Sequence, residues 1–187
     1  MHVTPTSIAG VFVINVARIE DDRGYFARTF CRREFTAAGL DPVVAQCATA
    51  HTHRRGTVRG MHFQLPPAAE VKLVRCVRGA LYDVAVDLRP GSPTFCQWFG
   101  VELSAVNGIM LYVPKGCAHG MQALTDDVDV VYQMSDFYAP HLARGVRWND
   151  PRIAIDWPLP VTVASMRDLN YPDLDLALVA PLVIFAG

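Results

Sequence analysis

Four ionisable side chains lie in or beside apolar segments, and they are of the types that transfer protons or hold anions. His62 lies within Gly56–Leu65, Lys72 lies in a second apolar segment, Tyr132 follows a run of valines, and His119 follows the turn Pro114–Gly116. A buried lysine is costly unless it is paired or used. Taken alone, a histidine or tyrosine here is more often part of the core. Together, the four indicate a site for acid–base chemistry.

The segment around His62 reads as a strand in which alternate residues share a face. This periodicity places Gly60 and Gln64 on the face of His62, and a glycine two residues away leaves open space beside the imidazole ring. Arg59 suits an anionic group, but strand parity directs it to the opposite face. Either a bulge at Gly60 redirects Arg59, or its side chain reaches around the edge of the strand.

The elements that must position these residues are mostly short strands separated by glycine and proline turns. The sequence predicts one short helix, Cys31–Ala38, which ends at Gly39, and a turn at Asp21–Gly24. Many short strands favour an all-β fold, an antiparallel sandwich or barrel with few helices. The predicted strands are Gly10–Ile19, Tyr25–Phe30, Val43–Ala50, Gly56–Leu65, Val71–Arg78, Ala80–Leu88, Thr94–Leu103, Gly108–Val113 and Val128–Ser135.

Length and composition limit the class of protein. A chain of 187 residues that is 51% hydrophobic suits a single domain, 1–187, with an irregular proline-rich segment after Tyr138. A net charge of −1 offers no basic excess for nucleic acid or a membrane surface. Five cysteines without a CxxC pair, and no visible secretory signal, favour a reduced, cytoplasmic protein. The apolar tail Leu176–Gly187 is too short to span a bilayer and is expected to pack on the domain or on a second subunit.

Common cofactor and catalytic signatures are absent from the sequence. There is no GxGxxG, P-loop, HExxH or GxSxG motif, so dehydrogenase and kinase functions have no support. His51 and His53 would face one way on a strand, but two arginines follow them, and a solvated loop is the expected setting.

Several motifs, in order and spanning Gly10 to Asp168, resemble the dTDP-4-dehydrorhamnose 3,5-epimerase family. They are Gly56–Gln64, Val86–Arg89, Ser92–Thr94 with Trp98, Pro114–Gly120, Tyr138–Pro140, Gly145–Pro151 and Ser165–Asp168. The resemblance implies a cupin-type jelly roll, a homodimer and a nucleotide-diphosphate sugar substrate with a 4-keto-6-deoxy ring. It implies no cofactor.

The resemblance assigns four catalytic residues whose types suit the chemistry. Inverting a carbon beside a ketone needs a base on one face, an acid on the other and a cation near the enolate oxygen. His62 would be the base, Asp168 would orient its imidazole, Lys72 would stand by the enolate, and Tyr132 would return a proton.

The resemblance also assigns substrate contacts, one position at a time. Arg23 and Arg59 match diphosphate-binding positions, and Phe26 matches an apolar contact beside the site. Gln46 and His119 match polar contacts to the substrate, and Tyr138 matches a ring that stacks on the base. Arg167 stands where lysine or arginine is usual. For Arg23 and Arg167, a solvated surface charge is the common alternative.

Three positions depart from the family pattern, and all fall among the nucleotide-binding positions. Arg28 and Ala143 stand where glutamate is usual, and Ala48 stands where asparagine is usual. A carboxylate that would accept hydrogen bonds has been lost and a cation gained. The sugar chemistry is therefore better supported than the identity of the nucleotide, which is open among dTDP, UDP, CDP and GDP.

Alternatives to a 3,5-epimerase are a 3-only epimerase or ketoisomerase on the same scaffold, and a sugar-binding jelly roll without catalysis. The presence of both a base and an acid argues against the binding protein. A cupin metal site is disfavoured, because Gln64 replaces a histidine ligand and the cation Lys72 follows Glu70 closely.

Overall fold

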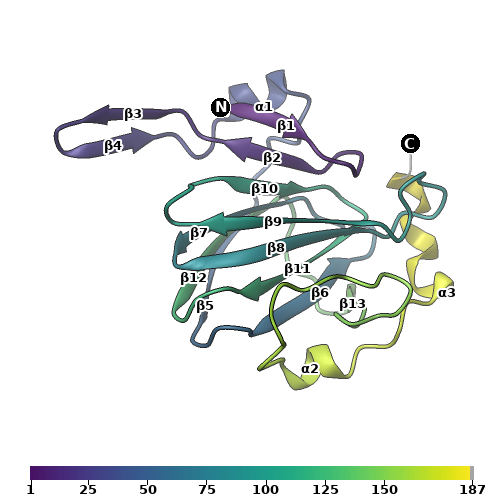
Figure 1. Cartoon of the computed structure of the whole chain (residues 1–187). Coiled ribbons are helices and arrows are strands. Elements are labelled where there is room, and N and C mark those ends of the chain that lie inside the picture. The colour runs from purple at the N-terminus through teal and green to yellow at the C-terminus, as the bar shows by residue number, and fades with distance from the viewer. Residues whose placement is uncertain (186–187) are drawn as a thin grey trace.

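A computed structural model describes residues 1–185, which form two facing antiparallel sheets and a projecting hairpin (Figure 1). The larger sheet has the order β1-β2-β10-β7-β12-β5, and the smaller has the order β13-β6-β11-β8-β9. This is the antiparallel jelly roll that the sequence predicted. The strands of the larger sheet are β1 (His2–Pro5), β2 (Phe12–Asn15), β10 (Met110–Val113), β7 (Lys72–Arg78), β12 (Val128–Met134) and β5 (Gln46–Thr52). Those of the smaller sheet are β13 (Ala143–Gly145), β6 (Val58–Gln64), β11 (Cys117–Ala123), β8 (Ala80–Asp87) and β9 (Trp98–Ser104).

Side chains from both sheets interlock to form the core. Val74 and Val130 of the larger sheet and Leu81 and Met121 of the smaller one belong to the same buried cluster. Packing of inward-facing residues from two sheets is what gives a sandwich or barrel its stability. The polar residues of the site must therefore lie where this apolar packing opens.

Two glycines allow strands β6 and β11 to approach closely next to His62. A Cβ atom added to Gly60, which has φ +136°, would lie 2.6 Å from Cα of Gly120. The register between the strands shifts here, because His119 faces His62 whereas Met121 faces Arg59. Strand β6 thus carries one extra residue, which is a bulge.

The loop after β8 explains one of the sequence motifs in structural terms. The buried carboxylate of Asp87 accepts hydrogen bonds from Arg89, Ser92 and Thr94. Burial alone would raise the pKa of Asp87, but these hydrogen bonds lower it. This motif closes the β8–β9 connection and does not line the site.

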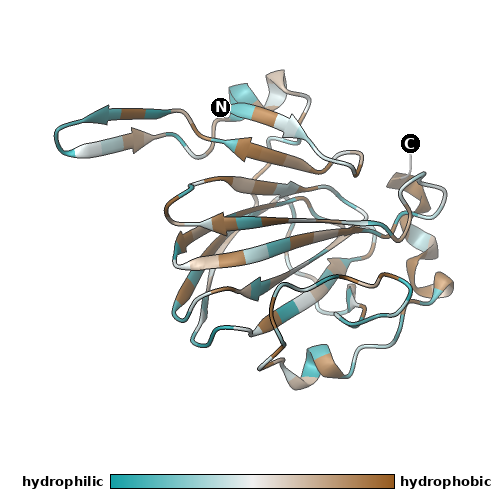
Figure 2. Cartoon of the chain, viewed as in Figure 1, coloured by the Kyte–Doolittle hydropathy of each residue, from teal (hydrophilic) through white to brown (hydrophobic). Residues whose placement is uncertain are grey.

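The hairpin of β3 (Arg18–Asp21) and β4 (Gly24–Ala27) forms an arm that extends beyond the two sheets (Figure 1). Its tip is hydrophilic, and hydrophobic patches occur along its strands (Figure 2). Ile19, Tyr25 and Phe26 are exposed on it, and Phe26 retains 66% of its accessible surface. An exposed apolar arm of this kind indicates a contact with another molecule.

The C-terminal segment packs on its own domain, which is one of the two predicted arrangements. Helix α3 (Leu176–Val179) and the 3₁₀ helix η1 (Ala180–Phe185) bury Val179 and Leu182 against the second core cluster. Residues 186 and 187 of the predicted tail lie outside the described residues. No helix among the described residues is long and apolar enough to cross a membrane.

Several predicted element boundaries were wrong. The single strand predicted over Gly10–Ile19 is two strands, β2 and β3, and the strand predicted from Tyr25 ends at Ala27. The strand predicted from Val43 begins at Gln46, and the one predicted from Thr94 begins at Trp98. Strands β1, β11 and β13 were not predicted. The predicted helix is confirmed as α1 (Arg32–Ala37), and α2 (Met166–Leu169) is a further short helix.

Candidate active site

An open cavity of about 450 Å³ lies between the two sheets, and a smaller one of about 210 Å³ adjoins it. His62, Lys72, Tyr132 and Arg167 line both cavities. Residues from β6 and β11 of one sheet and from β7 and β12 of the other therefore converge on one space. All four predicted catalytic residues line the larger cavity.

His62 and Asp168 form a hydrogen-bonded pair on the wall of the cavity. Asp168 Oδ1 lies 2.6 Å from His62 Nε2, and the side chain of Asp168 is 3% exposed whereas that of His62 is 38% exposed. Burial alone would raise the pKa of Asp168, but the hydrogen bond and charge of His62 and the Gly60 amide lower it. The ionised carboxylate fixes the ring so that its other nitrogen can serve as a base.

Helix α2 supplies Asp168 through a local signal in the sequence. Ser165 is the N-cap residue, and its hydroxyl accepts a hydrogen bond from the Asp168 amide at 3.1 Å. Ser-x-x-Asp is a helix-start pattern, and capping residues fix the first turn of a helix. The cap thereby directs Asp168 towards β6.

Lys72 is held at the cavity by a buried carboxylate. Its Nζ atom forms an ion pair with Glu70 Oε1, and the other oxygen of Glu70 accepts a hydrogen bond from Gln64 Nε2 at 3.2 Å. The side chain of Lys72 is 14% exposed and that of Glu70 is 9% exposed. Glu70 gives the lysine an ion-pair partner at a poorly solvated position, where Nζ can donate a hydrogen bond to a developing anion.

Tyr132 enters the cavity from the sheet that faces His62. Burial raises the pKa of the Tyr132 phenol, and the nearby charge of Asp83 raises it further. The phenol is therefore protonated across the physiological range. Its ring lies edge-on to His119, with 5.9 Å between the ring centroids.

A second histidine–carboxylate pair lies deeper in the same sheet as His62. His119 faces His62 directly across the β6–β11 pairing, and its Nε2 lies 2.8 Å from Asp83 Oδ1. Burial raises the pKa of Asp83. In the described part of the chain, Asp83 Oδ2 has no hydrogen-bond partner. The pair fixes the imidazole of His119 where it lines the cavity.

The bulge in β6 explains how the side chain of Arg59 reaches the same cavity as that of His62. Because β6 carries one extra residue between Arg59 and His62, both side chains line the larger cavity. Arg59 donates to Thr52 Oγ1 at 2.9 Å and to the His51 carbonyl at 2.8 Å. Of the two predicted explanations, the bulge is the one observed.

The smaller cavity gathers the predicted polar and stacking contacts. Gln46, Tyr138 and Arg167 line it. Gln46 Oε1 accepts the Tyr138 amide at 2.7 Å, so the two positions are coupled. The hydroxyl of Tyr138 beside the guanidinium raises the pKa of Arg167. A planar group entering this cavity would meet an exposed aromatic ring and a cation.

Three predicted contacts lie outside both cavities of their own chain. Arg23 and Phe26 belong to the arm, where Arg23 pairs with Asp21 at 2.6 Å. Arg28 follows the arm and lies 3.4 Å from Glu34. The structure does not bring these residues together with His62 within one chain.

The other two departures from the family pattern lie near the site. Ala143 lines the smaller cavity, and Ala48 lies on β5 between two residues, Gln46 and Ala50, that line one cavity each. Neither methyl group can hydrogen-bond to a ligand. The amide and carboxylate that are usual at positions 48 and 143 are therefore missing from, or beside, the walls of the cavity that Tyr138 lines.

Sequence reasoning missed four residues of the site. Asp83 and Glu70 orient His119 and Lys72, Ser165 caps the helix of Asp168, and the Tyr171 ring lies 5.8 Å from that of His62. Asp83 and Glu70 carried a usable signal, since a carboxylate in an apolar segment needs a partner. Tyr171 follows the last motif in an irregular segment and carried none.

Comparisons with known proteins identify the family of the chain. A family model described as dTDP-4-dehydrorhamnose 3,5-epimerase matches residues 5–175. The dTDP-4-dehydrorhamnose 3,5-epimerase of Sinorhizobium fredii is 44% identical over 93% of this chain and 90% of its own.

Two solved structures show the same fold. That of dTDP-4-dehydrorhamnose 3,5-epimerase from Bacillus anthracis, with TDP and PPi bound, has a TM-score of 0.90 and 38% identity over 92% of this chain and 99% of its own. That of ChmJ, a 3'-monoepimerase from Streptomyces bikiniensis in complex with dTDP-quinovose, has a TM-score of 0.86 and 38% identity over 96% of this chain and 90% of its own. The chain is an isomerase that belongs to the dTDP-4-dehydrorhamnose 3,5-epimerase family.

Proposed function

We propose that the protein epimerises C3, and then C5, of a nucleotide-diphosphate-4-keto-6-deoxyhexose, of the type that converts dTDP-4-dehydro-6-deoxyglucose to dTDP-4-dehydrorhamnose. The observation that carries the proposal is the position of His62 and Tyr132 on facing sheets across one cavity. A sugar ring between them would present one face to the imidazole and the other to the phenol. Inversion requires such an arrangement.

Each inversion is a balanced proton exchange at a carbon next to the ketone. The free nitrogen of His62 takes the proton, and the C–H electron pair moves into an enolate whose oxygen accepts a hydrogen bond from Lys72 Nζ. Tyr132 then donates its phenolic proton to the opposite face of the same carbon. Solvent removes the proton from His62 and restores that of Tyr132. Positioned acid–base groups contribute about 10²–10⁴-fold each to such rates.

No cofactor is part of this proposal. A proton exchange leaves the oxidation state of the sugar unchanged overall. The groups that occupy the cupin metal positions are also engaged with other protein groups. Glu70 is paired with Lys72 and Gln64, and His62 is paired with Asp168.

We further propose that the protein acts as a homodimer in which the arm of one chain reaches the cavity of the other. The exposed apolar surface of Phe26 and the free-standing position of the arm support this (Figure 1). Arg23 would then approach the diphosphate, and Phe26 would cover the cavity mouth. We place this dimer in the cytoplasm, because all five cysteines are free thiols.

A 3-only epimerase is the second candidate. The chain is as similar in sequence to the 3'-monoepimerase as to the Bacillus anthracis enzyme, at 38% identity to each, and this supports a 3-only epimerase as the alternative. Solvent deuterium exchange into a nucleotide-4-keto-6-deoxyglucose, read by mass, separates the candidates. Two labels are expected. One label would show a 3-only enzyme, and no label would show a binding protein.

A further inference from the structure

Four side chains of the types that bind metal ions gather on the outer surface of the larger sheet, on the side away from the active-site cavity. His51 lies at the end of β5, and Asp129 lies directly opposite it on β12. One step further along, the Asp127 amide donates to the His53 carbonyl at 3.3 Å, which continues the pairing beyond the strand. Residues two apart on a strand share a face, so the pairing brings all four together. Ala50 and Tyr132, of the opposite parity, line the cavity.

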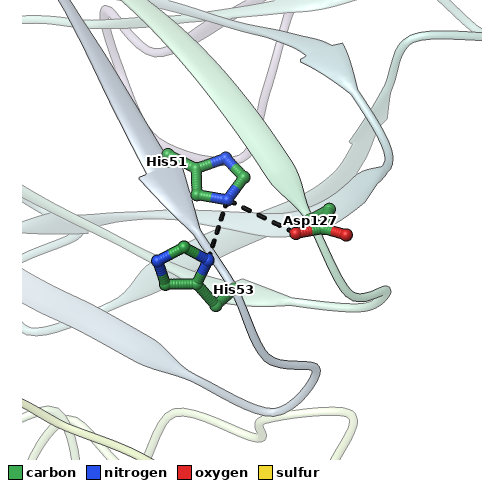
Figure 3. Close-up of side chains that lie close together, drawn as sticks. All are labelled: His51, His53 and Asp127. Atoms are coloured by element: carbon green, nitrogen blue, oxygen red, sulfur yellow. Dashed lines mark hydrogen bonds and ion pairs between the residues drawn. The ribbon is translucent and has the colours of Figure 1, made fainter.

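Three donor atoms of this cluster converge on one point (Figure 3). His51 Nε2 lies 3.1 Å from His53 Nδ1 and 3.4 Å from Asp127 Oδ1, and all three atoms lie within 4.8 Å of one another. In a tetrahedral zinc site with ligands at about 2.0–2.2 Å, neighbouring donors are separated by about 3.3–3.6 Å. The separations of 3.1 Å and 3.4 Å around His51 Nε2 are therefore close to those between ligand atoms of a bound zinc ion. The predicted solvated loop begins only after His51 and Thr52, which belong to β5.

Asp129 determines which nitrogen of His51 is free to coordinate. Its Oδ1 lies 2.6 Å from His51 Nδ1, so Nδ1 carries a proton and donates it to this carboxylate. In the neutral ring, Nε2 then presents a lone pair to Asp127 Oδ1, which is also an acceptor. The same lone pair lies 3.1 Å from His53 Nδ1, so an ion at this point would be within reach of all three atoms. A carboxylate on the far nitrogen is the usual support of a metal-bound histidine.

We infer that His51 Nε2, His53 Nδ1 and Asp127 Oδ1 bind one divalent transition-metal ion, with Asp129 orienting His51. Two imidazoles and a carboxylate suit Zn²⁺, and a water molecule fills the fourth position. Arg78 lies 3.8 Å from Asp127 Oδ2, the oxygen that does not face His51. The guanidinium lies on the side of the carboxylate away from His51, so Oδ1 faces the proposed ion.

The site would tie the end of β5 to the start of β12. The His51 carbonyl and the Thr52 hydroxyl both hold Arg59, which lines the cavity. An ion bound to His51 fixes the backbone from which this arginine is anchored. The expected role is structural, because none of the three ligands lines the catalytic cavity.

The test is Zn²⁺ binding by the full chain after chelator treatment and dialysis. Calorimetric titration with ZnCl₂ should show one site per chain, and Zn²⁺ should raise the melting temperature. His53→Ala and Asp127→Asn remove a ligand each. Asparagine tolerates the left-handed conformation of residue 127, which has φ +51°. Asp129→Asn removes the support of His51 and should weaken binding about 10–100-fold. The two ligand variants should weaken it at least as much.

Matched controls identify where the ion binds. His141→Ala and His2→Ala each remove an exposed histidine outside the cluster and should bind Zn²⁺ like the wild type. The metal-free melting temperatures of all variants should agree, which separates lost binding from lost folding. Failure of the wild type to bind Zn²⁺ would overturn the inference. Binding that survives in His53→Ala but is lost in His62→Ala or Cys47→Ser would place the ion elsewhere and overturn it equally.

Discussion

Asp168 lies 2.6 Å from Nε2 of His62, although 106 residues separate the two along the chain. The contact joins a capped turn near the C-terminal end of the chain to a bulged strand of the smaller sheet. It engages Nε2 of His62 and leaves Nδ1 of a ring that lines the cavity as the proposed basic atom. The proposed chemistry depends on this pair.

Replacing Asp168 by asparagine should preserve the fold and reduce turnover. The amide keeps the size of the side chain but cannot stabilise the imidazolium, so kcat should fall by about 10²–10⁴-fold with little change in KM. Steady-state kinetics at saturating substrate measures both. A kcat within threefold of wild type would remove Asp168 from the mechanism. Ser165→Ala, which weakens only the helix cap, is the matched control and should cost far less.

The same pair predicts a stability difference that depends on pH. Burial would raise the pKa of Asp168 and the contacts with His62 and Gly60 outweigh this, so the folded-state pKa is the lower one. The carboxylate therefore stabilises the fold above the unfolded-state pKa of about 3.9. This contribution is lost as the pH falls through the lowered folded-state value. The advantage of wild type over Asp168→Asn in urea unfolding should shrink between pH 5 and pH 3, and a constant difference would contradict it.

Tyr132→Phe should separate proton removal from inversion. The variant keeps His62 and Lys72, so deuterium exchange should continue, but reprotonation on the opposite face should slow by about 10²–10⁴-fold. The measurement compares label incorporation with epimer yield by NMR. An unchanged epimer yield would show that another group donates the proton. Tyr138→Phe, at the smaller cavity, is the matched control and should leave the yield intact.

The strands with a regular apolar pattern were the easiest to predict. β6, β7, β8 and β12 lie within two residues of their predicted boundaries. Strand β11 was missed although all seven of its residues are buried, because Gly120, His119 and Gln122 interrupt its apolar pattern. Each of the three meets a partner that is distant in sequence. Gly120 allows the close approach of β6, His119 pairs with Asp83, and Gln122 donates to the Leu159 carbonyl.

The site residues also divide into those that a local sequence pattern marks and those that only distant contacts position. His62, Lys72 and Tyr132 stand out locally as polar residues in apolar segments. Asp168 followed from the family motif, because no local pattern links it to His62 across the fold. The position of Arg59 depended on a bulge whose presence is decided by two glycines on neighbouring strands.

The arm can be tested by subunit complementation. His62→Ala removes the proposed base from the site of its own chain, and Arg23→Ala with Phe26→Ala removes the contacts from the arm. If each arm serves the partner, refolding an equal mixture should restore about a quarter of wild-type activity, because half the dimers then hold one intact site. If each arm serves its own chain, the mixture should stay inactive. An Asp22→Ala chain in place of the arm variant controls for substitution at the arm tip.

The nucleotide preference should be weaker than the family pattern would suggest. Ala48 and Ala143 cannot hydrogen-bond to a base, and each lost partner costs about 1–3 kcal/mol. Stacking on Tyr138 is retained for any base. Calorimetry should therefore show that dTDP binds less than about tenfold, or 1.4 kcal/mol, more tightly than UDP, CDP or GDP. A larger preference would show compensation by other groups. Ala48→Asn with Ala143→Glu should increase the preference for dTDP.

The variant His62→Ala tests whether His62 is the base that removes the proton. The enzyme and a nucleotide-4-keto-6-deoxyglucose are incubated in D₂O, and the mass of the sugar is followed with time, while calorimetry with the nucleotide diphosphate reports binding. Wild type should label the sugar rapidly, whereas His62→Ala should not label it above the rate without enzyme and should bind the nucleotide nearly as well as wild type. Labelling by His62→Ala near the wild-type rate would show that another group removes the proton and would contradict the assignment of His62 as the base.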